Sequence, residues 1–70
     1  MIGEIPNQLT PKQVEVLELV ANGYLTKQVA DIMGLSYHTV RGHVYALRQR
    51  LRAGNTTEAV AIGFRRKIIE

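Results

Sequence analysis

The chain has 70 residues, with 9 Lys and Arg against 6 Asp and Glu, a net charge of +3 and no cysteine. This length allows one small domain, and the lack of cysteine excludes disulfides and thiolate metal sites. The hydrophobic fraction of 46% suits a packed domain rather than a disordered tail. No apolar run approaches the roughly 20 residues that span a bilayer, and residues 1–10 lack a signal-peptide pattern. We therefore expect a small, basic, cytoplasmic binding module.

Charge is divided unevenly along the chain. Residues 1–35 carry two basic and four acidic side chains, whereas residues 36–70 carry seven basic and two acidic ones. A basic half beside an acidic half favours one face that meets an anionic surface such as nucleic acid. The alternative is a solvated helical face with surplus arginines.

The punctuation after the first eight residues predicts an all-α fold. No stretch alternates for long enough to predict a strand, and glycine-containing breaks separate four segments with helical periodicity. The predicted helices cover residues 11–22, 26–33, 37–52 and 57–67. Residues 1–8 show no such periodicity, so we expect a flexible arm followed by one domain over 9–70.

Polar residues before three of these helices predict their caps. Thr10 and Gln13 match a capping box at the start of the first helix. Ser36 is suited to cap the third helix, and Thr56 or Thr57 the fourth. Each of these three starts therefore has an acceptor for backbone N–H groups that have no partner within the helix.

The third predicted helix carries two neighbouring stripes. One is apolar and is predicted to be buried: Val40, Val44, Leu47 and Leu51. The other lies about 100° around the helix and is basic with an aromatic: Arg41, Tyr45, Arg48 and Arg52. A short helix, a tight turn and a helix of this kind predict a helix-turn-helix, whose second helix enters the DNA major groove. The competing interpretation is a helical protein-interaction domain with solvated arginines.

An ordered set of short motifs runs without a gap from Leu9 to about Ile69. It comprises Leu9-Thr10-Pro11, Glu15-Val16-Leu17, Ala21-Asn22-Gly23, Lys27-Gln28-Val29-Ala30, Leu35-Ser36, Thr39-Val40-Arg41, His43, Leu51, Asn55 and Glu58-Ala59-Val60. This set resembles the LuxR/GerE-type helix-turn-helix domains of bacterial transcription regulators. The resemblance implies a four-helix domain whose third helix enters the major groove and whose fourth helix contributes to a dimer on DNA.

The resemblance also implies roles for individual residues. Base-contacting positions fall on Arg41, Gly42 and Tyr45. Phosphate-contacting positions fall on Lys27, Thr39, Arg48 and Arg50, and the free N–H groups at the Ser36 end of the third helix can meet a further phosphate.

Each base-contacting position has a competing interpretation. Arg41 is a phosphate contact or a solvated side chain, and Tyr45 a half-buried packing residue. Gly42 is a tolerated surface glycine, although a glycine within a helix costs about 1 kcal/mol relative to alanine.

The remaining expectations concern the fourth helix and three positions that depart from the family pattern. Val60, Ala61 and Phe64 are predicted to form a dimer interface, or instead to complete the core of the domain. Gln13 and Gln28 stand where the family usually has Glu, so we expect hydrogen bonds there in place of ion pairs. Tyr24 and Leu25, the latter where the family commonly has a capping Ser or Thr, are expected to fill the core between the first two helices.

These patterns together predict sequence-specific binding to double-stranded DNA for transcription regulation, as a homodimer on an inverted repeat. The alternative is a protein-binding module of the same fold: an anti-activator that pairs with a larger regulator, or a contact to RNA polymerase like that of sigma-factor region 4. The sequence has no catalytic signature and no metal-ligand spacing, since His38 and His43 lie about 140° apart on a helix. We therefore expect no enzyme activity, no metal and no cofactor.

Overall fold

The computed structural model describes residues 9–70, which form four helices and no strand. The helices are α1 (Pro11–Ala21), α2 (Thr26–Met33), α3 (Tyr37–Leu51) and α4 (Thr56–Arg65). The all-α prediction is confirmed, and the arm expected at 1–8 lies outside the described residues. Within residues 9–70, no helix is long and apolar enough to cross a membrane.

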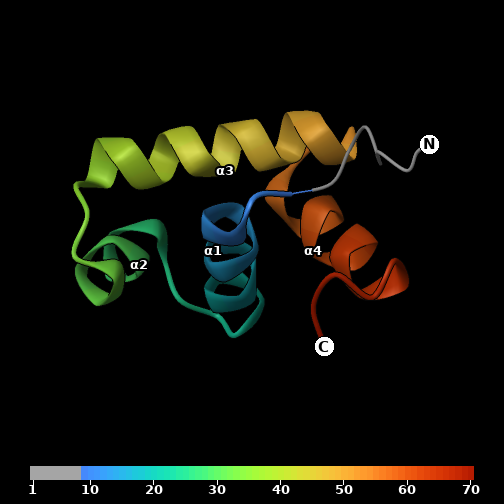
Figure 1. The fold of residues 1–70 in the computed structure, drawn as a ribbon, viewed down its shortest axis with the longest axis horizontal. Coiled ribbons are helices and arrows are strands. Elements are labelled where there is room, and N and C mark those ends of the chain that lie inside the picture. The colour runs from blue at the N-terminus through green and yellow to red at the C-terminus, as the bar shows by residue number, and fades with distance from the viewer. Residues whose placement is uncertain (1–8) are drawn as a thin grey trace.

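Helix α3 lies along one side of the domain, and the other three helices pack beneath it (Figure 1). Helix α1 occupies the middle and packs against all of the others, whereas α2 and α4 lie on either side of it (Figure 1). The largest fully buried side chains come from the first three helices: Val16, Leu17, Val29, Val40, Leu47 and Leu51. Burying each of them contributes about 1.5–3 kcal/mol, which holds α3 against α1 and α2.

The predicted caps of α1 and α3 are confirmed, and the one predicted for α4 is wrong. Thr10 Oγ1 accepts from the Gln13 N–H at 3.2 Å, and Gln13 Oε1 accepts from the Thr10 N–H at 3.0 Å. The cap of α4 is Asn55, whose Oδ1 accepts from the Glu58 N–H at 2.7 Å. Because Asn55 takes the capping position, Thr56 becomes the first residue of the helix and not its cap.

Three helices end earlier than predicted. Asn22 caps α1, so this helix ends at Ala21 rather than at 22. Helix α3 ends at Leu51 because Arg52 adopts a left-handed conformation with φ 56°. Helix α4 ends at Arg65, and Lys67 is left-handed with φ 59°. Non-glycine residues rarely adopt this conformation, so the sequence carried no signal for either of these two ends.

The expectation that Tyr24 and Leu25 fill the core is wrong. Their side chains are 43% and 70% exposed. Leu25 is the last residue before α2 and has no side-chain acceptor, so the helix starts at Thr26 without a capping side chain. Gln28 Oε1 instead accepts from the Leu25 N–H at 2.8 Å. The turn after Gly23, which has φ +96°, therefore leaves both apolar side chains on the surface.

Gly42 and Gly63 both lie inside helices but have opposite surroundings. A Cβ atom at Gly63 would lie 2.8 Å from Leu17 Cδ2 and 3.2 Å from Ile69 Cγ1, so this glycine lets α4 approach α1 closely. A Cβ atom at Gly42 would meet nothing within 4 Å. Packing therefore requires a glycine at position 63 but not at position 42.

The same substitution at these two glycines should change stability in opposite directions. Gly42→Ala should raise the free energy of unfolding by about 0.5–1 kcal/mol, since alanine favours the helix. Gly63→Ala should lower it by about 1 kcal/mol, because overpacking costs more than the helix gains. Urea unfolding followed by circular dichroism measures both changes. A gain in stability at Gly63 would contradict the close packing of α4 on α1.

Candidate nucleic-acid interface

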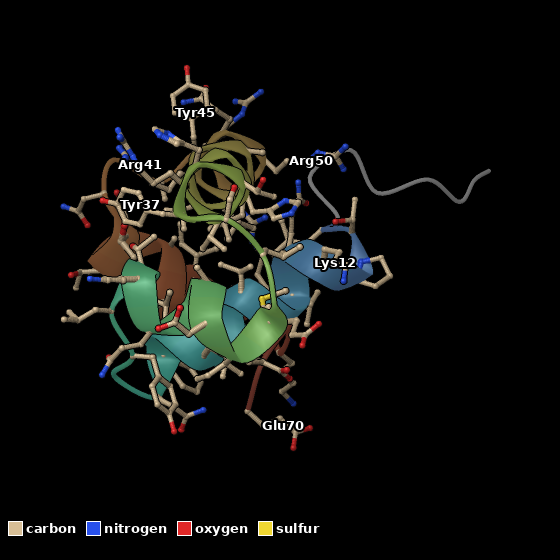
Figure 2. The ribbon with its side chains drawn as sticks, turned by 90° about the vertical axis from the view of Figure 1, so that its left-hand side faces the viewer. Lys12, Tyr37, Arg41, Tyr45, Arg50 and Glu70 are labelled. Carbon is tan, nitrogen blue, oxygen red and sulfur yellow. The ribbon has the colours of Figure 1, made fainter. Side chains whose placement is uncertain are left out.

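Helix α3 buries one stripe and exposes the rest of its surface. Val40, Leu47 and Leu51 are at most 1% exposed, and Val44 is half-buried against the core. Arg41, Gly42 and Tyr45 are exposed. Figure 2 views the domain nearly along α3 and shows Tyr45 pointing away from the other helices. The three residues predicted to contact bases therefore lie on the free surface of this helix.

Arg41 is held to one side of α3 by an aromatic neighbour. Its guanidinium carbon lies 5.8 Å from the centre of the Tyr37 ring, one helical turn earlier. The Tyr37 ring in turn meets His38 edge-on, with ring centres 6.1 Å apart. A cation–π contact at an exposed site contributes about 0.5–1 kcal/mol, enough to bias the side chain without locking it.

The start of α2 and one side of α3 form a continuous, shallow surface. A hollow of about 200 Å³ is lined by Thr26, Tyr37, Arg41, Val44, Tyr45 and Arg48. A second hollow shares Thr26 and Tyr37 with the first and is lined by Leu25 and the exposed Lys27 as well. The fold thus brings Lys27, from another helix, to the side of α3 that presents Arg41.

Ser36 and Thr39 form the N-terminal cap of α3. Ser36 Oγ accepts from the Thr39 N–H at 3.0 Å and donates to Thr39 Oγ1 at 2.8 Å. Because Thr39 Oγ1 accepts this bond, its own hydroxyl hydrogen remains available for an outside acceptor. The pair orients one donor at the exposed start of the helix, where a phosphate oxygen can also approach the free N–H groups.

Arg48 and Arg50, the other two predicted phosphate contacts, differ in their surroundings. Arg48 is half-buried, and its Nη2 donates to the Gly54 carbonyl at 2.7 Å. This bond links α3 to the loop before α4, so Arg48 supports the fold whatever else it contacts. Arg50 is exposed and extends to the other side of α3, the side on which Lys12 lies (Figure 2).

Within the basic stripe predicted from the sequence, Arg41 lies at the edge of the free surface of α3, whereas Tyr45 lies nearer its centre. At about 100° per residue, Arg41 lies only about 80–120° from the buried Val40, Leu47 and Leu51. The positions opposite the core are exposed and recur at spacings of 4, 3 and 4 residues: His38, Gly42, Tyr45 and Gln49. We call these four residues the outer line of α3. Measuring angles from the centre of the apolar stripe would have identified Gln49 and His38 from the sequence.

Helix α4 divides its small residues between the core and the surface. Ala59, Ile62 and Gly63 are buried against the other helices. Of the predicted dimer residues, Val60 is half-buried against the core, whereas Ala61 is exposed and Phe64 is 46% exposed. Thr57 is also exposed and completes an uncharged stripe with Ala61 and Phe64 at helical spacing.

The sequence is similar to a family of bacterial regulators and to individual response regulators. Residues 7–62 match the family described as bacterial regulatory proteins, luxR family. The chain belongs to the luxR family. It is 34% identical over 53 residues to the tetrathionate response regulatory protein TtrR of Salmonella typhimurium. This match covers 76% of this chain and 26% of TtrR. It is 30% identical over 67 residues to the response regulator protein VraR of Staphylococcus aureus, which covers 96% of this chain and 32% of VraR. The chain thus spans about a third or less of the length of these relatives.

Two glutamines in this luxR-family chain make the hydrogen bonds expected of them. Gln13 and Gln28 stand at the third position of α1 and α2, and each accepts from the N–H of the residue before its helix. A neutral amide makes these bonds without adding negative charge close to the start of α2. Among residues 9–70, no three His, Asp or Glu side chains come together as they would to hold a metal ion.

Proposed function

We propose that residues 9–70 of this luxR-family chain bind double-stranded DNA sequence-specifically and thereby regulate transcription. The observation that carries the proposal is that α3 buries its apolar stripe and leaves Arg41, Gly42 and Tyr45 free, beside the start of α2. An α-helix fits the major groove, and helix-turn-helix domains insert their second helix there. Contact with bacterial chromosomal DNA requires a cytoplasmic location.

Base readout would come from the free surface of α3. The Arg41 guanidinium can donate two hydrogen bonds to O6 and N7 of guanine. Gly42 has no side chain to hold the helix away from the base edges, and the Tyr45 ring can contact a thymine methyl group or a sugar. The Arg41–Tyr37 contact leaves the guanidinium near the surface from which it would enter the groove.

Phosphate contacts would fix the position of α3 in the groove. Lys27 and Arg50 are both exposed, and each would meet one of the two DNA backbones that border the groove. The cap formed by Ser36 and Thr39 would add N–H and O–H donors. Such contacts orient a protein on the duplex without reading its sequence. Arg48 would contact a phosphate only through those N–H groups of its guanidinium that do not already donate to the Gly54 carbonyl.

Selection of bound DNA from a random duplex pool tests the proposal. We expect enrichment of one short sequence, arranged as an inverted repeat. Affinity for that sequence should fall steeply between ~50 and ~200 mM salt, because each neutralised phosphate adds about −0.9 to the log–log slope. Neither enrichment nor salt dependence is expected of a domain that binds only proteins, so their absence would reject the proposal.

A homodimer formed through α4 would account for an inverted repeat. The stripe of Thr57, Ala61 and Phe64 is exposed, uncharged and partly apolar, and Val60 borders it. Two copies related by a two-fold axis would pair these stripes and present two α3 helices to successive half-sites.

Phe64→Glu should prevent the two copies from pairing. A charge on a central apolar contact costs about 2 kcal/mol or more, so affinity for the full inverted repeat should fall by about 30-fold. Affinity for a single half-site should not change. Gel-shift titrations on both duplexes measure the two affinities. Tyr24→Glu is the matched control, because Tyr24 is similarly exposed, at 43%, but lies in the turn between α1 and α2. Equal losses on both duplexes would contradict pairing through α4.

A second candidate function, binding of a protein partner, is favoured by a groove away from α3. The groove has a volume of about 380 Å³ and combines Ile32 and Phe64, both about half exposed, with the acidic Glu15 and Glu18. The partner that binds in this groove would be RNA polymerase or a larger regulator. If Arg41→Ala leaves activity intact while Phe64→Glu or Ile32→Glu abolishes it, this candidate replaces DNA binding.

A further inference from the structure

The outer line of α3 ends in a residue for which neither the family resemblance nor the sequence pattern gave a role. Gln49 is exposed and still helical, because α3 continues to Leu51. It lies about 160–180° around the helix axis from the buried Val40, Leu47 and Leu51. Gly42 lies about as far from the core, but it has no side chain, so the side chain of Gln49 is the one on α3 that points most directly away from the core.

We propose that Gln49 is a specificity-determining residue that reads an adenine in the major groove. This inference rests on the proposed function and adds a base pair to those read by Arg41 and Tyr45. The side-chain amide offers a donor and an acceptor side by side, which match N7 and N6 of adenine.

The position of Gln49 relative to Gly42 makes this contact reachable. The two residues lie on the same line, seven residues or about 10.5 Å apart along the axis of α3. Because Gly42 lacks a side chain and nothing lies within 4 Å of where its Cβ would be, the helix can come closest to the bases there. The side chain of Gln49, two turns further along α3, would then extend into the groove toward the neighbouring base edges.

The chemistry of the residue distinguishes a base contact from a phosphate contact. Arginines stand on both sides of Gln49 in the sequence, at 48 and 50, and another follows at 52. Cationic side chains suit phosphate binding, and a neutral amide adds little to it. At the last position of the outer line, the chain instead carries a side chain that can discriminate between bases.

The experiment compares the sequences selected by the wild type, Gln49→Met and Asp31→Ala. Methionine keeps the length of the side chain and removes only the amide. Asp31 is an exposed residue of α2 that lines neither the groove nor the hollows described above, so its variant tests for non-specific effects. We expect the wild type to require an A·T pair at one position of each half-site, with a preference of about 5- to 150-fold over other pairs. In Gln49→Met that position alone should become degenerate, with the rest of the motif and the salt slope unchanged.

Other outcomes overturn the inference. An unchanged motif in Gln49→Met would show that the residue does not read bases. A uniform loss of affinity for all duplexes, with a shallower salt slope, would assign Gln49 to phosphate binding. A wild-type selection without any enriched sequence would reject the proposed function itself, and the inference with it.

Discussion

Leu47→Ala is expected to lower the free energy of unfolding by about 2–5 kcal/mol, the range for a truncated leucine in a packed core. Leu47 is 1% exposed and lies on the buried stripe of α3. Since α3 packs against each of the other helices, a cavity in its buried stripe weakens the packing of the whole domain. A chain of 70 residues without disulfides has a small stability margin, so the variant should be largely unfolded at 37 °C.

Thermal and urea unfolding followed by circular dichroism measure this effect. Tyr45→Ala is the control, because Tyr45 lies on the same helix but is 63% exposed. Its substitution should change stability by about 0.5 kcal/mol or less. Comparable losses in the two variants would contradict the orientation of α3 in the structure.

Arg41→Ala is expected to weaken binding to the selected duplex by about 5- to 150-fold, the equivalent of one lost bidentate contact to guanine. The variant also loses the contact with the Tyr37 ring, which contributes only about 0.5–1 kcal/mol to stability. The domain should therefore stay folded while its sequence preference is lost. Arg41→Lys should recover little, since lysine keeps the charge but lacks the planar pair of donors.

Affinities for the selected duplex and for an unrelated duplex separate base readout from phosphate binding. If Arg41 reads guanine, Arg41→Ala weakens the first affinity far more than the second. Equal weakening of both would assign Arg41 to the phosphates. Arg66→Ala, a change of charge beyond the end of α4, is the control and should leave both affinities nearly unchanged.

Most of the fold follows from short-range patterns. Apolar spacing gave four helices, and the capping residues Thr10, Gln13 and Ser36 marked two of the starts correctly. These features depend on hydrogen bonds between residues three positions apart, and such bonds form wherever the helix forms. The capping side chain of α4 was missed because Asn55, Thr56 and Thr57 are all suitable, and local pattern does not rank them.

The surface of the domain followed less directly from the sequence. Apolar periodicity assigns residues to a stripe but does not say how wide the covered part of a helix is. Leu25 and Ile32 are apolar and yet 70% and 52% exposed, since no other helix covers them. Arg48, predicted as a phosphate contact, is partly committed to the Gly54 carbonyl by the approach of the loop before α4.

The sequence by itself determined the all-α architecture, the family and the helix that carries the basic stripe, because each depends on local periodicity, caps and ordered motifs. Tertiary structure decided which side of each helix is covered. It separated Gly42, which faces open space, from Gly63, against which Leu17 packs. It also placed Lys27 beside the face of α3 that presents Arg41. These relations depend on how helices distant in sequence pack together, which local pattern does not encode.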